Sequence, residues 1–272
     1  MPDRSDINER MKTFYEFIPK TKLMRRCPVI IRLDGRSFHT FTKGFNRPFD
    51  EILIKTMQET TKYLCENIQG AVLGYTQSDE ISLLITDYAT FETDAWFDYE
   101  VQKLCSISAS MATLAFNKAF ENEIMAQTKR LYTEYIANDD YSYIDTLERA
   151  MDKGAMFDSR CFNIPKEEVT NYFYSRQLDA MRNSIQMVGQ ANFSHRELQF
   201  KSIKQIISLL EAHRGINWNE LPIYQQRGSA CIKQDTYIDY PDGTRVLRKK
   251  WKTDKNIPIF KDEGRTYIED LI

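Results

Sequence analysis

Short apolar runs alternate with amphipathic stretches along most of the chain. The run from Pro28 to Leu33 is apolar and rich in β-branched residues, which predicts a buried strand. Over residues 49–69 the apolar positions recur at helical spacing, and Gly70 ends this stretch. The same patterns predict the further elements in this order: strands at 71–76 and 81–86, a helix at about 95–127, a strand at 157–163, helices at about 165–188 and 200–213, and a β-hairpin within 229–259.

The β-α-β-β-α-β order of the first six elements is typical of the split βαβ, or ferredoxin-like, arrangement. In this arrangement the third strand lies between the first and second strands and runs antiparallel to both. Asp34 ends the first expected strand, while Asp79 and Glu80 directly precede the third. The topology therefore predicts that these carboxylates meet at one edge of the sheet, although they lie far apart in the sequence.

These elements predict an α+β fold, with helical elaborations on a ferredoxin-like sheet and a β-hairpin near the C-terminus. We expect residues 1–190 to form the main domain, with an irregular acidic insertion at 133–155. Residues 191–272 are expected to form a helix and hairpin elaboration packed on that domain. The segment from Tyr240 to Gly243, Tyr-Pro-Asp-Gly, is the turn signal of this hairpin.

The composition is that of a globular protein, with 42% hydrophobic and 28% charged residues among 272. The 37 Lys and Arg against 39 Asp and Glu give a net charge of −2. This balance excludes indiscriminate coating of nucleic acid, because such binding depends on neutralising phosphates. The charge is uneven, however, with a net +3 over residues 1–26, −5 over 134–152 and +5 over 244–255. Shaped recognition of one folded RNA therefore remains open.

The number and spacing of the cysteines and histidines limit the kinds of metal site and the cellular compartment to expect. The five cysteines are scattered without a CxxC motif, which is typical of reduced thiols in a cytosolic protein. The three histidines argue against a histidine-rich metal site. No apolar run approaches the roughly 18 residues that a membrane span needs, and the first residues lack the apolar stretch of a signal peptide. We therefore expect a cytoplasmic protein without a membrane segment.

Two carboxylates that meet at a sheet edge suggest a Mg²⁺ site, because hard cations prefer oxygen ligands and also bind phosphates. Two such ions can activate an attacking oxygen and stabilise a leaving one during nucleotidyl transfer. By spacing alone, Asp34-Gly35 also fits an ordinary turn, and Ser78-Asp79-Glu80 a solvated hairpin tip. Gly35 allows close approach of a phosphate. The basic residues that could bind a triphosphate are Arg36, His39, Arg47 and Lys103.

Two sequence blocks carry a resemblance to a known family. They are IRLDGRSFH at residues 31–39 and GYTQSDEIS at residues 74–82. In this order and at this spacing they resemble the tRNA-His guanylyltransferase family closely. Further matches are Trp96-Phe97, Lys103, Phe157-Asp158-Ser159-Arg160, Tyr172-Phe173, Arg176-Gln177, Asp179 and Arg227-Gly228. The resemblance covers most of residues 10–230.

The resemblance implies a polymerase-type palm that binds two Mg²⁺ ions and adds nucleotides to the 5′ end of RNA, in the 3′-to-5′ direction. It also implies GTP and ATP as substrates, tRNA as partner and a homotetrameric assembly. By the same resemblance, Asp34 and Asp79 hold the metals through their side chains and Gly35 through its carbonyl, with Glu80 as a further catalytic candidate. The implied nucleotide-binding residues are Asp34, Gly35, Arg36, Ser37, Phe38, His39, Arg47, Ser78, Asp79 and Lys103.

One block departs from the family pattern. Eukaryotic members carry HINNLYN in the helix after the last palm strand, where this chain has MRNSIQM at residues 181–187, and only Asn183 clearly matches. The chain thus resembles the bacterial and archaeal guanylyltransferase-like branch, whose members restore missing 5′ nucleotides on tRNA against the opposite strand as template. We therefore expect template-dependent 5′-end repair, with addition of the −1 guanosine to histidine tRNA as the alternative.

Two more remote alternatives are a nucleotide cyclase, which shares the palm, and a non-catalytic RNA-binding module on a ferredoxin-like sheet. The aliphatic run Leu83 to Ile85 disfavours the second, because RNA-binding sheets of that kind present aromatic side chains. The basic C-terminal hairpin is nevertheless a candidate polyanion contact, since it also contains Trp251. Its candidate RNA-binding residues are Arg245, Arg248, Lys249 and Lys250.

Overall fold

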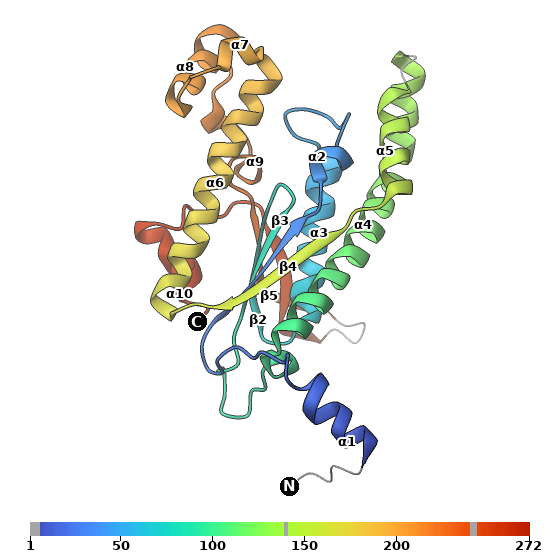
Figure 1. Ribbon diagram of the computed structural model, residues 1–272. Coiled ribbons are helices and arrows are strands. Elements are labelled where there is room, and N and C mark those ends of the chain that lie inside the picture. Colours follow the sequence, from blue (N-terminus) through green and yellow to red (C-terminus); the bar gives the residue numbers. More distant parts are fainter. Residues whose placement is uncertain (1–5, 139–140, 240–243) are drawn as a thin grey trace.

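The computed structural model describes residues 6–138, 141–239 and 244–272 (Figure 1). Its strands form one antiparallel sheet with the order β4-β1-β3-β2-β5-β6. The strands are β1 Val29–Gly35, β2 Ala71–Gln77, β3 Glu80–Ile85, β4 Phe157–Asn163, β5 Ser229–Asp239 and β6 Arg245–Asp254. Strand β3 lies between β1 and β2 and runs antiparallel to both, so the predicted ferredoxin-like order and the α+β class are confirmed.

Helices connect the strands of the palm. Helix α3 (Glu51–Asn67) leads from β1 to β2, and α4 (Val101–Asn138) and α5 (Ser142–Lys153) lead from β3 to β4. After β4, the main helices are α6 (Lys166–Asn192) and α8 (Ile203–Arg214). The shorter helical elements are α1 Ile7–Met11, η1 Lys12–Glu16, α2 Phe38–Phe41, η2 Trp96–Tyr99, α7 His195–Leu198, η3 Trp218–Glu220, α9 Ile223–Arg227, η4 Asp262–Arg265 and α10 Thr266–Glu269.

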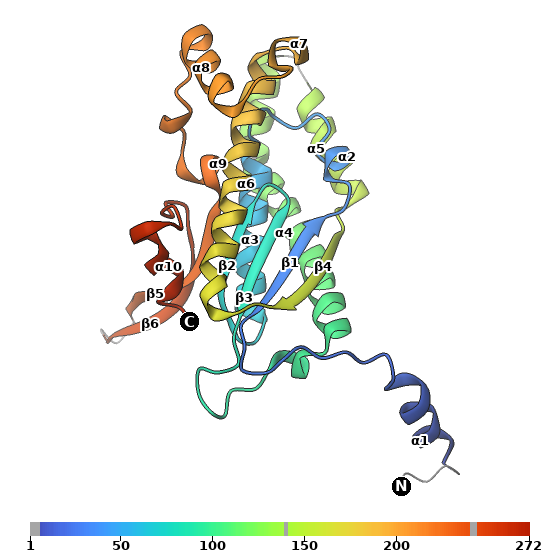
Figure 2. The same cartoon turned by 60° about the vertical axis from the view of Figure 1, so that its left-hand side comes forward.

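Alternating residues of the sheet supply two cores. Val29 and Ile31 of β1 face one side, where α3 and α4 cover the sheet, and both are fully buried. Ile30 points to the other side and packs with Val169 and Phe173 of α6. Figure 2 shows these helices on opposite faces of the sheet. Asp34, at the end of β1, is half-buried.

The C-terminal hairpin predicted from the sequence is confirmed, and it joins the palm sheet. Strand β5 pairs with β2 through three residues, from Gly74 opposite Cys231 to Thr76 opposite Ser229. The expected turn at 240–243 lies outside the described residues. Since β5 continues the same sheet, the proposed division of the chain at residue 190 stays a prediction.

The expectation of an irregular insertion at 133–155 is wrong, because most of this segment lies on the backbone of α4 and α5. The acidic residues lie on a helix whose period places Leu147 and Ala150 in the core, with Ile144 packed against it. Gly154, with φ of 66°, then ends α5. Within the described residues no helix is long and apolar enough to cross a membrane.

Candidate active site

The acidic residues predicted to meet at one edge of the sheet do meet there, and one backbone hydrogen bond joins their two segments. Asp34 lies opposite Glu80 in the β1–β3 register, and the Gly35 N–H donates to the carbonyl oxygen of Asp79 at 3.0 Å. Ser78 and Asp79 form the two-residue turn between β2 and β3. Ser78 has φ of 51°, in a turn position that usually takes glycine, which is the kind of strain found at functional sites. The predicted convergence of these acidic residues is confirmed.

The segment after β1 folds back over the sheet edge. Ser37 adopts a left-handed conformation (φ 55°) and starts α2, which turns Phe38 into the core beside Phe116 and Phe157. A Cβ added at Gly35 would lie 2.2 Å from the Phe38 ring. Gly35 is therefore required by Phe38, in addition to any approach of a phosphate.

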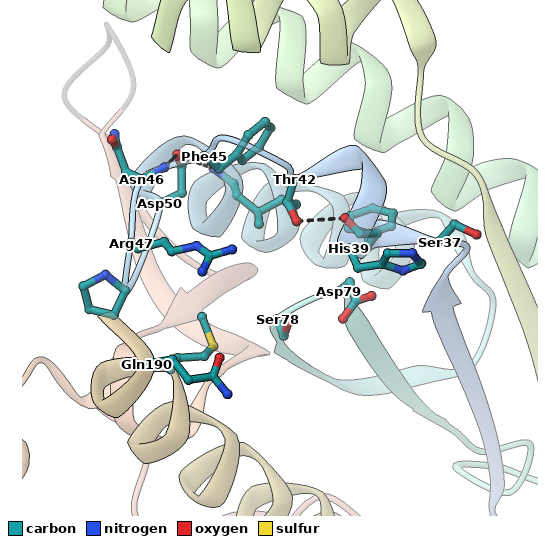
Figure 3. Close-up of a pocket in the computed structure, with 15 residues that line it drawn as sticks. Ser37, His39, Thr42, Phe45, Asn46, Arg47, Asp50, Ser78, Asp79 and Gln190 are labelled. Carbon is teal, nitrogen blue, oxygen red and sulfur yellow. Dashed lines mark hydrogen bonds between the residues drawn. The ribbon is translucent and has the colours of Figure 1, made fainter. Parts of the chain in front are cut away.

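Next to this edge lies a cavity of about 480 Å³, a size suited to a nucleotide (Figure 3). Arg47 faces it from the α2–α3 connection, and Gln190 of α6 lies across from it. Its lining residues are Gly35, Ser37, Phe38, His39, Thr42, Phe45, Asn46, Arg47, Pro48, Asp50, Leu53, Ser78, Asp79, Met187 and Gln190. Seven of the ten residues implied as nucleotide-binding are thus brought together, although Phe38 is only 4% exposed and presents little more than a ring edge.

Three predicted residues lie elsewhere. Asp34 does not line the cavity itself, but it precedes Gly35, which does. Arg36 lines a neighbouring hollow of about 420 Å³ together with Lys153. Lys103 is exposed near the start of α4, 3.9 Å from Glu100 and above the Phe97 ring. The helix rise places it about 20 Å along α4 from Phe116, which packs at the cavity end. Within one chain Lys103 therefore does not line the cavity, and its phosphate-binding role stays a prediction.

Glu80 is buried behind the cavity, where two arginines bind it. Its Oε2 accepts from Arg32 at 2.6 Å and from Arg176 at 3.4 Å, and Arg176 also contacts Asp179 at 2.5 Å. Burial raises the pKa of Glu80, and the two guanidinium groups partly oppose this. Its Oε1 is buried without a hydrogen-bond partner among the described residues. This arrangement places Glu80 beside the acidic edge, with its catalytic role still a prediction.

The acidic edge has a chemistry suited to a divalent cation. Burial raises the pKa of Asp79, and the neighbouring Asp34 charge raises it further, against hydrogen bonds from its own backbone and from Ser78. A cation between Asp34 and Asp79 would relieve this repulsion. Among the described residues no three His, Cys, Asp or Glu side chains gather as a metal cluster. Two carboxylates and the Gly35 carbonyl nevertheless fit Mg²⁺, which is usually held by one or two carboxylates together with substrate phosphates.

Two parts of the site were not predicted to act there, although Met187 and Asp158 both lie in blocks that were compared with the family. Met187 and Gln190 form one wall, and their i, i+3 spacing on a long helix was the available signal. Asp158 of β4 lies directly opposite Asp34. Asp158, Asp34 and Glu80 thus form a row of carboxylates across three strands. Like charges in such positions cost stability, and Arg160 beside Asp158 and Arg32 beside Glu80 partly offset this cost.

A palm-like α+β sheet whose edge brings two carboxylates to a nucleotide-sized cavity defines the class of palm-type nucleotidyltransferases. The family model described as Thg1, tRNAHis guanylyltransferase, matches residues 8–165. The chain therefore belongs to the tRNAHis guanylyltransferase family, and it is a nucleotidyltransferase.

Solved and curated relatives agree with this assignment. The structure of a bacterial tRNA(His) guanylyltransferase (Thg1)-like protein in complex with ATP is 41% identical, covers 98% of both chains and superposes with a TM-score of 0.78. Protein R259 of Acanthamoeba polyphaga mimivirus is 32% identical over 84% of this chain and 77% of its own length. The tRNA(His) guanylyltransferase of Saccharomyces cerevisiae is 24% identical over 84% of this chain and 91% of its own. The predicted resemblance to the bacterial branch is confirmed.

Proposed function

We propose that this protein repairs the 5′ end of tRNA by adding nucleotides in the 3′-to-5′ direction, with the opposite strand as template. The observation that carries the proposal is that Asp34 and Asp79 meet at one sheet edge, where Gly35 and Asp79 line the 480 Å³ cavity. The 41% identical bacterial relative binds ATP, and a second structure of a bacterial Thg1-like protein, 40% identical, is in complex with GTP. GTP and ATP are therefore the proposed substrates here.

Two Mg²⁺ ions are the proposed cofactor. The carboxylates of Asp34 and Asp79 and the carbonyl of Gly35 would hold them, and when bound they would supply charge neutralisation at the reacting phosphate. The chain's own residues bind and orient the nucleotide. Arg47 carries no ion pair among the described residues and faces the cavity, so its guanidinium is free to bind a triphosphate.

The opposite walls of the cavity position the rest of the nucleotide. His39 and Ser37 lie at the α2 end, where their polar atoms can hydrogen-bond phosphate or ribose. Met187 and Gln190 close the α6 side with one apolar and one amide group. The amide can donate to and accept from a base, and the thioether suits a flat apolar surface. Met187 belongs to the block at residues 181–187 in which the chain departs from the eukaryotic pattern, and this supports repair over −1 guanosine addition.

The test uses a tRNA that lacks its first 5′ nucleotide and carries a 5′-triphosphate, with intact tRNA as control. Each labelled nucleoside triphosphate is supplied in turn with Mg²⁺. Repair predicts that the incorporated nucleotide is complementary to the opposing base, and that changing this base changes the nucleotide. If guanosine is added to intact histidine tRNA and no shortened tRNA is extended, the guanylyltransferase alternative is favoured. Accumulation of cyclic nucleotide without RNA labelling would contradict both.

The basic strand β6 is the proposed docking site for the body of the tRNA. Arg248, Lys249 and Lys250 are exposed on this edge strand, and the Arg245 guanidinium lies 4.4 Å from the centre of the Tyr237 ring. A basic edge with interleaved aromatic side chains suits a phosphate backbone. Salt-sensitive tRNA affinity is expected to fall when these charges are removed, while nucleotide binding is kept.

A homotetramer in the cytoplasm is the proposed setting. Helix α1 projects away from the sheet in Figure 1, and the exposed apolar residues of this N-terminal segment include Ile7, Tyr15, Phe17 and Ile18. Such a patch suits a contact between subunits. Light scattering should give the mass of four chains, and the double substitution Phe17→Asp and Ile18→Asp should reduce it.

The proposed compartment, the cytoplasm, is consistent with the cysteines. All five are free thiols, as is usual in a reducing compartment.

A further inference from the structure

A second hollow lies directly beside the nucleotide cavity. It has a volume of about 650 Å³ and is built from the C-terminal part of α6, from α7 and from the loop that leads to α8. Arg47 and Gln190 line both this hollow and the nucleotide cavity. A ligand in the hollow therefore lies next to the nucleotide in the cavity, with the Arg47 guanidinium between the two.

Phe200 is the unusual residue of this hollow. Its side chain is 95% exposed, and its φ of 62° puts a bulky residue in the left-handed region. Both features are unfavourable for an aromatic residue without a ligand, and strain of this kind marks functional positions. An exposed aromatic ring of this kind offers a flat surface for a nucleobase.

The loop that carries Phe200 is fixed at both ends. A capping box between Ser194 and Glu197 starts α7, and a second one between Ser202 and Gln205 starts α8. The backbone amide of Lys201 donates to the Leu198 carbonyl at 3.1 Å, immediately after the ring. The backbone at Phe200 is thus set by its neighbours, so binding has to order only the side chain of this residue.

The charges around the ring suit a nucleic acid. Arg47, His195 and Lys201 line the hollow, and their side chains have no ion pair among the described residues. Phosphates supply the partner that such groups lack, and an aromatic ring supplies a stacking surface for a base. Grooves that combine these two features bind single-stranded nucleic acid with little sequence preference.

We propose that Phe200 is a stacking platform for an unpaired base of the RNA substrate, and that Lys201 binds its flanking phosphate. The base belongs to the strand opposite the 5′ end, because a shortened 5′ end leaves nucleotides of that strand unpaired. This inference rests on the proposed function and deepens it, since it assigns the feature of the RNA that separates damaged from intact ends. Unpaired ends are the parts of an RNA whose base faces are free to stack on aromatic side chains.

The experiment compares Phe200→Ala with Phe200→Trp, and Phe91→Ala serves as the matched control. Phe91 is also 95% exposed but lies between β3 and η2, at the other end of the sheet. The probe is an acceptor-stem hairpin shortened at its 5′ end, with 2-aminopurine in the unpaired 3′ strand. Affinity, extension rate and 2-aminopurine quenching are measured, together with the KM for GTP.

Phe200→Ala is expected to weaken binding of the shortened hairpin about tenfold, within the range for loss of one base–aromatic stack, and to abolish the quenching. Phe200→Trp should keep both, the KM for GTP should not change, and Phe91→Ala should behave as the wild type. A blunt-ended hairpin should bind Phe200→Ala and wild type alike.

Three results would overturn the inference. The first is an active wild type whose Phe200→Ala variant binds and quenches within twofold, which rejects the platform and leaves the proposed function standing. The second is a Phe200→Ala variant in which the mass of the assembly in solution changes while the RNA affinity does not. This result would make the surface around Phe200 a contact between subunits. The third is a wild type that neither binds nor extends any RNA, which rejects the proposed function together with the platform.

Discussion

The backbone amide of Gly35 donates a hydrogen bond to the carbonyl oxygen of Asp79 at 3.0 Å. This contact joins the end of β1 to the turn between β2 and β3, and it brings the carboxylate of Asp34 close to that of Asp79. Two acidic residues that are distant in the sequence become one site because the third strand of the fold is inserted between the first two. The site therefore depends on how closely the backbone packs at Gly35.

Gly35→Ala should destabilise the protein by about 1–3 kcal/mol, the usual cost of overpacking a core. The reason is the Phe38 ring, whose nearest atom would lie 2.2 Å from the new Cβ. Urea denaturation of Gly35→Ala, Phe38→Leu and the double variant measures the coupling. The double variant should lose less than the sum of the two single losses, and strict additivity would contradict the contact.

Arg176→Met should lower the free energy of unfolding by about 1–3 kcal/mol, since Glu80 then keeps only Arg32 as partner in a buried position. Arg160→Met is the matched control on the same face. Arg176 is 17% exposed and Arg160 is 54% exposed, and Arg160 pairs with an exposed Asp158. The control should cost less than about 1 kcal/mol. An equal loss of unfolding free energy in both variants would show that burial does not determine how much these ion pairs stabilise the protein.

The fold was largely predictable, because β1, β2 and β3 are short, mainly apolar runs bounded by turn residues. The meeting of Asp34 with Asp79 at one edge of the sheet followed from the topology alone. The helical period of α5 is also present in the sequence, at Leu147 and Ala150, although the many acidic residues of this segment are typical of a solvated loop.

Other parts of the site were not predictable from the chain alone. Lys103 matches a family position, yet the length of α4 places it far from the cavity. Phe38 lies inside a motif of nucleotide-binding residues, but its ring fills the core beside Gly35. The wall formed by Met187 and Gln190 depends on how α6 crosses the sheet, which no local pattern specifies.

Removing two charges from β6 should weaken tRNA binding and make it less sensitive to salt. Each lost phosphate contact lowers the slope of log affinity against log salt by about one, so Arg248→Ala with Lys249→Ala should lower it by about two. Filter binding between low and moderate salt gives the slope. Lys261→Ala, an exposed lysine outside β6, is the control. An unchanged slope in the double variant would remove β6 from the RNA interface.

Cys161 should react slowly with alkylating agents in the folded protein. Burial, and then the adjacent Cys105 thiol at 3.6 Å, raises the pKa of Cys161 to about 12. The thiolate is the reactive form, so at pH 8.5 labelling should be at least about tenfold slower in the native protein than in urea. Mass spectrometry of digested samples gives the rates. Cys105→Ala should stay slow, because burial is the larger cause, and equal rates in native and unfolded protein would contradict this environment.

The central claim is that the two carboxylates at the sheet edge carry out nucleotide addition to RNA. The most direct measurement is the rate at which a 5′-shortened tRNA is extended with Mg²⁺ by the wild type, by Asp79→Asn and by Asp94→Asn. Asp94 is an exposed carboxylate that lies between β3 and η2, away from the cavity. Asp79→Asn should lose about a thousandfold in rate, because several kcal/mol of transition-state stabilisation are removed. Its melting temperature should stay at or above that of the wild type, since a buried charge beside Asp34 is removed. Asp94→Asn should extend the RNA at the wild-type rate, and an Asp79→Asn variant that keeps more than about a tenth of that rate would contradict the account.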